Sequence, residues 1–207
     1  SRTNNFLAGI HIANNIAGAA FLDVSTGEFY MAQGSIAYVD KLLQTFKPSE
    51  VILQKNKQTA FTDIYGERFY INTFDDWVFT YDFAREILLK QFGTTSLKGF
   101  GVDEMDAGII AAGASLYYLA ETQHDKLGHI IRIARIEEDH YVWLDKFTIR
   151  NLELVNSINE QGATLLNVID KTVTPMGSRL LRRWVLMPLK DIKPIEERLD
   201  MVQWFIE

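Results

Sequence analysis

Apolar and polar residues alternate in short runs over the first third of the chain, a pattern typical of β-strands joined by tight turns. Turn residues separate these runs at Asn14 and Asn15, and again at Gly27. The expected strands are residues 6–13, 17–23 and 28–32. Three short strands with tight turns predict an antiparallel meander.

The apolar spacing then changes to three and four, which predicts a helix that begins at Ser35 and ends at Pro48. Residues 50–53 form the next expected strand, a parallel addition reached through that helix. Further along we expect a short helix over 57–66, a strand over 69–72 and a helix over 81–92 closed by Gly93. This order of elements predicts an α/β fold with a mixed sheet.

A long helix is expected from Asp103 to about Lys126. Its apolar stripe consists of Met105, Ile109, Ala112, Leu116 and Leu119. Three carboxylates are expected in its first turn, where they interact with the positive helix end: Asp103, Glu104 and Asp106.

From residue 146 the pattern is helical to the end of the chain, and Thr148 is expected to begin the first helix. Thr174 followed by Pro175 predicts another helix start, with Pro188 as its end. A last helix begins at Asp191, and its expected inward face is Ile195, Leu199, Val202 and Ile206. The chain therefore divides into an α/β unit over 1–126, a joint over 127–145 with strands at 130–136 and 141–144, and a helical unit over 146–207.

Composition narrows the possible functions. A formal net charge of −6 disfavours autonomous DNA binding, because phosphate contacts need clustered Lys and Arg. The chain has no cysteine, which excludes disulfides and thiolate metal sites and agrees with a cytoplasmic protein. No apolar run approaches the roughly 20 residues needed to cross a bilayer, so we expect no membrane partner. A start without Met and an end inside a helical pattern predict a piece of a longer protein.

The region after the joint resembles the core-domain entry of the MutS family of DNA mismatch-repair proteins. The residues that carry this resemblance are Asp145, Thr148, Asn151, Leu152, Glu153, Leu154, Thr174, Met176, Gly177, Arg179, Leu180, Leu181, Trp184, Pro188 and Leu189. Residues 18–29 and the order of elements before the joint resemble the connector domain of the same family. The resemblance covers essentially the whole chain.

The resemblance implies a ribonuclease-H-like, mixed-sheet connector domain (domain II) followed by the truncated α-helical start of the core, or lever, domain (domain III). It implies a parent protein that is a homodimeric ATPase using ATP and Mg, binds mismatched DNA in the bacterial cytoplasm at the nucleoid, and recruits the partner MutL. In that parent, the connector would touch other MutS domains, couple the mismatch-binding and ATPase regions, and offer a MutL-docking surface.

The chain itself is expected to be non-catalytic and to hold no cofactor or metal. Residues 93–99 have the wrong spacing for a phosphate-binding loop. The family reads mismatches with a phenylalanine and a glutamate, and the one similar run, at residues 205–207, is interpreted as helix packing. Residues 23–27 resemble a sugar-kinase phosphate loop, but Val24 and Ser25 stand where that loop needs glycine.

A ribonuclease-H-like fold raises one catalytic alternative, a two-metal nuclease, which needs several carboxylates around two cations about 4 Å apart. Asp23 on a strand is the best candidate, and the others are Asp103, Glu104 and Asp106. The structural interpretation assigns Asp23 to a turn and the other three to helix capping. We favour the structural interpretation, because a single strand carboxylate does not make a metal site.

Three further groups have both a functional and a structural interpretation. The histidines lack metal-ligand spacing: His11, His124, His129 and His140. Arg179, Arg182 and Arg183 could meet phosphate, but pairing with Asp170, Glu196 or Glu197 is favoured in an acidic chain. The group Trp77, Phe79 and Tyr81, with Phe83, could form an acid-rimmed partner surface, although packing beneath a loop is favoured.

Overall fold

The computed structural model describes residues 3–123, 127–159 and 162–207. The described chain divides into two compact units: Asn4–Ile136, and Glu137–Glu207 together with Thr3. The division falls inside the segment 127–145, so residues 127–136 belong to the first unit.

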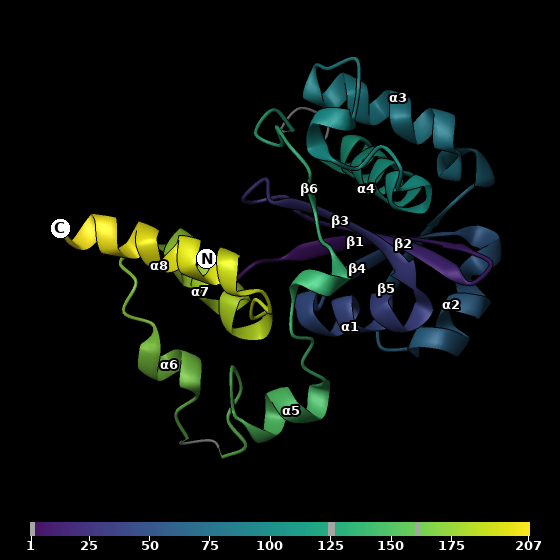
Figure 1. Ribbon diagram of the computed structural model, residues 1–207. Helices are drawn as coiled ribbons and strands as arrows, with labels where there is room; N and C mark the ends of the chain where they lie inside the picture. The colour runs from purple at the N-terminus through teal and green to yellow at the C-terminus, as the bar shows by residue number, and fades with distance from the viewer. Residues whose placement is uncertain (1–2, 124–126, 160–161) are drawn as a thin grey trace. The chain divides into compact units, whose positions relative to one another are not determined.

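A six-stranded mixed sheet forms the centre of the first unit, in the order β5-β4-β1-β2-β3-β6 (Figure 1). The strands are β1 (Phe6–Ala13), β2 (Ile16–Asp23), β3 (Phe29–Ser35), β4 (Glu50–Gln54), β5 (Tyr70–Phe74) and β6 (Ala134–Arg135). The first three strands pair antiparallel, and the other three each run parallel to a neighbour. Both the predicted meander and the parallel addition are confirmed.

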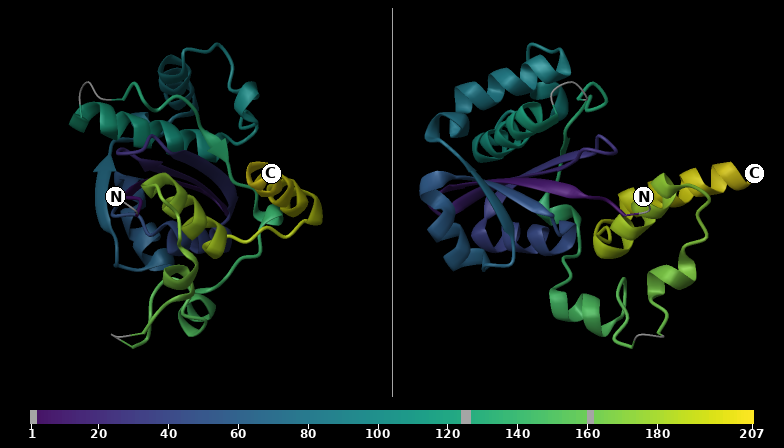
Figure 2. Two further views of the ribbon diagram at one scale, coloured as in Figure 1. Left: turned by 90° about the vertical axis from the view of Figure 1, so that its left-hand side faces the viewer. Right: turned by 180° about the vertical axis from the view of Figure 1, so that it is seen from behind.

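Helices cover both faces of this sheet (Figures 1 and 2). Those on one face are α1 (Ile36–Phe46) and α2 (Gln58–Tyr65), and those on the other are α3 (Tyr81–Phe92) and α4 (Asp106–Gln123). Short 3₁₀ turns η1 (Lys55–Lys57), η2 (Asp76–Phe79) and η3 (Lys98–Phe100) connect them. The predicted α/β class, a ribonuclease-H-like mixed sheet between helices, is confirmed.

Each strand divides its side chains between two apolar layers, because successive residues point to opposite faces. On β2, Ala20 and Leu22 belong to the core beneath α3 and α4. Between them Phe21 points the other way and stacks on Phe46 of α1, with ring centroids 4.3 Å apart. The sheet is therefore buried on both faces, as its nearly continuous apolar strands require.

Helix α4 lies directly against the backbone of β1 and β2. A Cβ added at Gly9 would overlap the carbonyl of Ala111, and one at Gly18 would overlap the backbone of Ala107. The predicted apolar stripe is buried, from Met105 just before α4 at 6% exposed to Ile109 within it at 0%.

The start of α4 differs from the prediction. The helix begins at Asp106. Two of its first amides, the N–H groups of Ala107 and Gly108, donate to Gln33 Oε1 of β3 at 2.8 and 3.2 Å. Asp103 and Glu104 precede the helix, so the expected capping by all three carboxylates is wrong. The predicted end at Lys126 lies outside the described residues.

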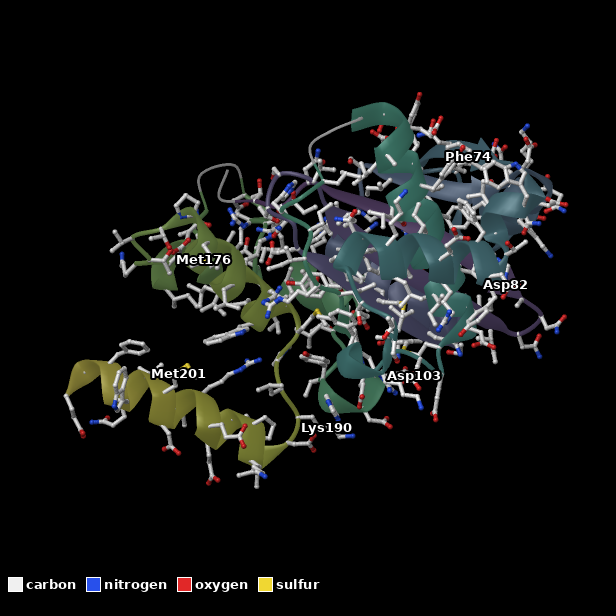
Figure 3. All side chains as sticks on the ribbon, turned by 90° about the horizontal axis from the view of Figure 1, so that it is seen from above. Phe74, Asp82, Asp103, Met176, Lys190 and Met201 are labelled. Carbon is white, nitrogen blue, oxygen red and sulfur yellow. The ribbon has the colours of Figure 1, made fainter. Side chains whose placement is uncertain are left out.

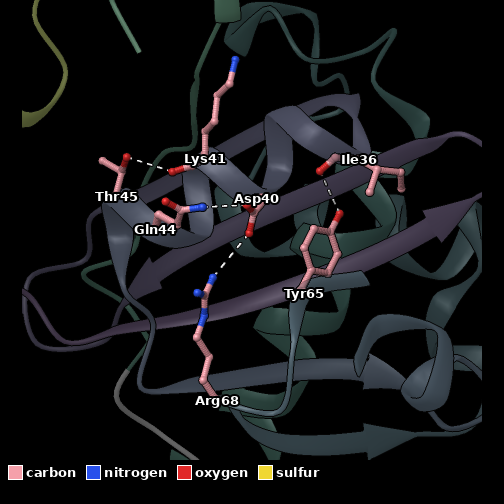
Figure 4. Close-up of polar contacts among 7 residues, drawn as sticks. All are labelled: Ile36, Asp40, Lys41, Gln44, Thr45, Tyr65 and Arg68. Atoms are coloured by element: carbon pink, nitrogen blue, oxygen red, sulfur yellow. Dashed lines mark hydrogen bonds and ion pairs between the residues drawn. The ribbon is translucent and has the colours of Figure 1, made fainter. Parts of the chain in front are cut away.

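Polar contacts fasten α2 to α1 on the opposite face (Figure 4). Ser35 caps α1 as predicted, accepting from the Tyr38 N–H at 3.1 Å. The Tyr65 hydroxyl donates to the carbonyl of Ile36, and burial, followed by the charge of Asp40, raises the pKa of Tyr65. Arg68 contacts Asp40 at 3.4 Å from the loop after α2.

The second unit is helical and has a small core. Its helices are α5 (Lys146–Asn151), α6 (Leu165–Ile169), α7 (Pro175–Leu186) and α8 (Ile192–Ile206), preceded by the 3₁₀ turn η4 (Glu138–His140). One cluster of buried residues consists of Ile149, Leu154, Val155 and Leu186.

Two predictions for the joint and the last helix are wrong. The expected strands at 130–136 and 141–144 reduce to β6 and a single bridge between Tyr141 and Leu189. The expected inward face of α8 is exposed, at 38% for Ile195, 62% for Leu199, 49% for Val202 and 73% for Ile206. Helical periodicity identifies an apolar face, but it does not supply the element that covers it.

We predict that Gly9→Ala destabilises the first unit by about 1–3 kcal/mol, the usual range for overpacking a filled core. The added methyl group would force α4 away from β1. Urea unfolding of the 207-residue chain measures the change. Gly99→Ala is the matched control, since nothing lies within 4 Å of its added Cβ, and it should stay within about 1 kcal/mol of the parent. Equal effects of the two substitutions would contradict the close packing of α4.

Candidate functional site: signature residues and the aromatic surface

The first signature residues build the entry to the helical unit. Asp145 is the N-cap of α5, and its Oδ1 accepts from the Thr148 N–H at 2.6 Å. This hydrogen bond lowers the pKa of Asp145. The helix therefore begins at Lys146, two residues before the predicted start, because the acid and not the threonine is the cap.

Glu153 closes the loop that follows α5. Its backbone adopts a left-handed φ of 47°, and its carboxylate accepts from the Ile158 N–H at 2.6 Å and the Ser157 hydroxyl at 2.9 Å. These bonds lower the pKa of Glu153. Leu154 beside it is 7% exposed. Glu153 therefore forms the turn, and Leu154 packs into the core of the helical unit directly after it.

The second signature block joins α6 to α7 through hydroxyl groups. Thr164 and Thr174 cap the two helices, and Thr174 Oγ1 accepts from the Gly177 N–H at 3.1 Å with Pro175 following it. The predicted start at Thr174 is thereby confirmed. Asp170 accepts from the Thr172 N–H and from the hydroxyls of Thr172 and Ser178, so this acid links the loop to α7.

Helix α7 carries Trp184, which meets a residue of α8. The Arg198 guanidinium lies 4.3 Å from the centre of the Trp184 ring, within the range of a cation–π contact. Arg182 is half-buried, and burial lowers its pKa. The sequence does not predict this contact, because Arg198 lies fourteen residues from Trp184 and on another helix.

The remaining signature positions differ in burial. Leu152 and Met176 are 60% and 71% exposed, and Asn151 is also exposed. The half-buried positions are Gly177, Arg179, Leu180, Leu181, Pro188 and Leu189. The described signature residues therefore cap helices, form the turn at Glu153 and supply Trp184 for the contact with α8. They do not bring reactive side chains together in a cluster.

Asp23 is fully buried at the end of β2 and is saturated with hydrogen bonds. It accepts from the Ser25 N–H at 2.9 Å, the Ser25 hydroxyl at 2.6 Å, Asn4 Nδ2 at 2.7 Å and the Asn5 N–H at 3.2 Å. Burial pushes its pKa upward, but the bonds from Ser25, Asn4 and Asn5 outweigh burial and hold the pKa below its usual value. The turn interpretation of Asp23 is confirmed.

The other nuclease candidates lie far from Asp23. Ala107, beside Asp106, rests on Gly18, and Asp23 is five residues further along the same strand, roughly 17 Å at 3.4 Å per residue. Asp23 also points to the α1 face, since it alternates with Leu22, whereas α4 covers the opposite face. Asp23 therefore does not converge with the acids at the start of α4, and no such metal cluster is present among the described residues.

The aromatic group does not form one exposed patch. Trp77 is 51% exposed, but Phe79 is 5% exposed and stacks beside His11 with ring centroids 6.2 Å apart. The Trp77 ring packs edge-on against Phe83 at 5.0 Å and Tyr117 at 5.3 Å. In Figure 3, the nearby Asp82 and Phe74 mark this end of the first unit. Only Trp77 and the rings it touches reach solvent, with Tyr81 half-buried beside them.

The described histidines have structural partners or surroundings. His129 Nε2 lies 2.6 Å from the Val24 carbonyl, and His140 contacts Glu137 at 3.1 Å. Burial, followed by the charge of Lys57, lowers the pKa of His11. His124 lies outside the described residues. Within the described ranges, no group of three or more His, Cys, Asp or Glu side chains could hold a metal ion, and no helix could cross a membrane.

The described residues form a mixed-sheet unit with helices on both faces, followed by a unit of capped helices. The family description MutS domain II matches residues 5–131, and MutS domain III matches residues 147–207. The chain belongs to the MutS family of DNA mismatch-repair proteins, with residues of its connector domain II and of domain III.

Individual relatives agree with this assignment. The chain is 56% identical over 204 residues to the DNA mismatch repair protein MutS of Parabacteroides distasonis, covering 99% of the chain and 23% of that protein. It is 56% identical to MutS of Flavobacterium johnsoniae and 52% identical to MutS of Cytophaga hutchinsonii, covering 99% of the chain and 24% of each protein. The chain therefore spans about a quarter of the length of these relatives.

We predict that Asp23 makes stability depend on pH in the acid range. Its folded pKa lies below the unfolded value of about 3.9, so its contribution is complete above that value and is lost as pH falls through the folded pKa. Asp23→Asn should therefore lower the free energy of unfolding at pH 7, and the difference from the parent should shrink toward pH 3. Urea unfolding at several pH values tests this, with the exposed Asp63→Asn as control. A constant difference at all pH values would refute the assignment.

Proposed function

We propose that this chain is the coupling part of a MutS protein, joining the region that binds mismatched DNA to the region that hydrolyses ATP with Mg. The parent would act as a homodimer at the nucleoid of the bacterial cytoplasm. Family membership supports this role, and one structural observation carries it: the chain leaves the sheet unit from a fixed point. The Ile136 N–H donates to the Met31 carbonyl at 2.8 Å, and the Tyr38 hydroxyl donates to the Ile136 carbonyl at 3.4 Å.

A fixed exit point is what a mechanical connection requires. Ile136 is 5% exposed, and Ala134 and Arg135 pair with β3 immediately before it. A displacement of the sheet unit therefore reaches Glu137 without slack, since the backbone before it is hydrogen-bonded. Coupling between two sites also requires two states with different contacts, which the parent's DNA and nucleotide would supply.

Residues 93–99 support a coupling role without ATP binding by this chain. Gly93 ends α3 with a left-handed φ of 61°, so residues 93–99 follow a helix, whereas a phosphate-binding loop precedes one. The chain would transmit a change of shape, and the ATPase chemistry would belong to other parts of the parent.

We predict that a four-residue Gly–Ser insertion between Ile136 and Glu137 of the full-length parent uncouples its two activities. Basal ATP hydrolysis and mismatch binding should each remain within about twofold of the parent, because neither site is altered. The stimulation of ATP turnover by mismatched DNA should be largely lost, because the inserted residues introduce slack. Steady-state ATPase assays with matched and mismatched duplexes measure both quantities.

The control is the same insertion between Asn14 and Asn15, in the exposed turn of the β1–β2 hairpin. It adds the same residues to the same unit without touching the exit from the sheet. Full stimulation in the Ile136 variant, or equal loss in both variants, would count against coupling through this segment.

A second proposed role is docking of MutL, for which the exposed Trp77 is the supporting observation. A Trp that is 51% exposed and held edge-on by two other rings presents a large, rigid apolar surface, the type of side chain that dominates protein interfaces. The exposed Asp76 and Asp82 beside it favour a partner with basic residues.

We predict that Trp77→Ala weakens MutL binding by the 207-residue chain at least about tenfold, as removal of an interface hot spot typically does. Calorimetric titration without nucleotide measures the affinity. Tyr70→Ala is the control, because Tyr70 is 68% exposed in the same unit but lies on β5. Unchanged affinity in Trp77→Ala, or the absence of MutL binding by the unsubstituted 207-residue chain, would contradict this docking role. Coupling would then be the one proposed role that is left.

A further inference from the structure

The segment that follows the sheet unit pairs with residues 187–191, which connect α7 to α8 and are called the elbow below. The Val142 N–H donates to the Pro188 carbonyl at 2.8 Å, and the Lys190 N–H donates to the His140 carbonyl at 3.1 Å. Between these two bonds, Tyr141 and Leu189 form an antiparallel bridge. Residues 140–142 and 188–190 therefore make a two-bond ladder, which we term the clasp, and Lys190 marks its place in Figure 3.

The clasp is stiffened on its entry side. Residues 138–140 form the turn η4, and Trp143 Nε1 donates to the Glu138 carbonyl at 2.7 Å, which ties the residue after the clasp to the turn before it. The Trp143 and Tyr141 rings meet edge-on at 6.0 Å. The clasp also begins only four residues after Ile136, the fixed exit of the sheet unit.

Helix α8 is the last helix of the helical unit. None of its residues, all of which the structure describes, is buried. Its apolar stripe therefore does not hold it against the rest of the helical unit. The contact of Arg198 with Trp184 is one attachment, and the connection at its first turn is another.

We infer that the clasp is the element that sets the direction of α8, so that the helix follows any displacement of the segment leaving the sheet unit. This inference rests on the proposed coupling function and assigns the transmission to particular residues. Residues 140–142 and 188–190 act here as positioning residues.

Proline substitution removes one bond of the clasp at a time. Tyr141 has φ −125° and ψ 150°, the extended conformation that a residue before proline prefers, so Val142→Pro fits the chain at Tyr141 while losing the N–H donor. Val142 is 44% exposed, and Val142→Ala is the matched control because it keeps the donor. Lys190→Pro and Lys190→Ala form a second pair on the other side of the clasp, at an exposed side chain.

The direction of α8 can be measured directly because the chain has no cysteine. Spin labels at Asp139→Cys and Glu196→Cys, both exposed positions, report the distance between the clasp and α8 by pulsed electron resonance. The labelled 207-residue chain without further substitutions, and both alanine variants of it, should each give one narrow distance distribution. Val142→Pro should broaden it at least about twofold, because a lost backbone bond turns the elbow into a hinge.

Circular dichroism checks that the helices remain. Should Val142→Pro lose helical signal, Lys190→Pro supplies the measurement, since it removes the other bond. A distribution as narrow in a folded proline variant as in its alanine control overturns the clasp. Equal broadening in the proline and alanine variants also overturns it, because the side chain and not the backbone bond would then hold the elbow.

The full-length parent separates this inference from the coupling function. If both hold, Val142→Pro loses most of the mismatch stimulation of ATP turnover, whereas Val142→Ala retains it. A broadened distribution with full stimulation supports the clasp and contradicts coupling through it. A narrow distribution with lost stimulation overturns the clasp and leaves the coupling proposal standing on other contacts.

Discussion

The first unit depends on the contact between α4 and the backbone of the sheet. Gly9 and Gly18 lie under this helix, where any side chain would overlap Ala111 or Ala107. The close approach lets the small residues of α4 pack against two central strands, and it leaves room for α3 beside it. Because interiors are packed to crystal-like density, a helix this close cannot slide without disturbing both layers. The sheet and α4 therefore move as one body.

The helical unit is held together in a different way. Among the described residues its main buried cluster is small, and its helix starts are fixed by the side chains of Asp145, Thr164 and Thr174. Capping groups each contribute about 1 kcal/mol and fix where a helix begins, but they do not fix where it points. Direction has to come from contacts at the ends of the helices. The bonds between residues 140–142 and 188–190 provide such a contact, and they lie where the two units are joined along the chain.

Much of this fold was predictable because its signals are local. Ser35 and Thr174 cap helices where the sequence places them, and the alternation of residues 6–23 predicts the β1–β2 hairpin. The errors share a physical cause, which is that a partner distant in sequence decides the outcome. Gln33 on β3 caps α4 in place of nearby acids. Phe79 belongs to the core although Trp77, two residues before it, is exposed. The apolar stripe of α8 is exposed because periodicity does not identify what covers it.

The same distinction between local and distant partners decides how the carboxylates are used. An acid in a ribonuclease-H-like fold could bind a metal only if its oxygens were free and other acids faced it. Asp23 accepts four hydrogen bonds from Asn4, Asn5 and Ser25, which stabilise its charge within the turn. A cation would have to displace these donors without gaining a second strand carboxylate. The position therefore holds the end of β2 in place through these four hydrogen bonds.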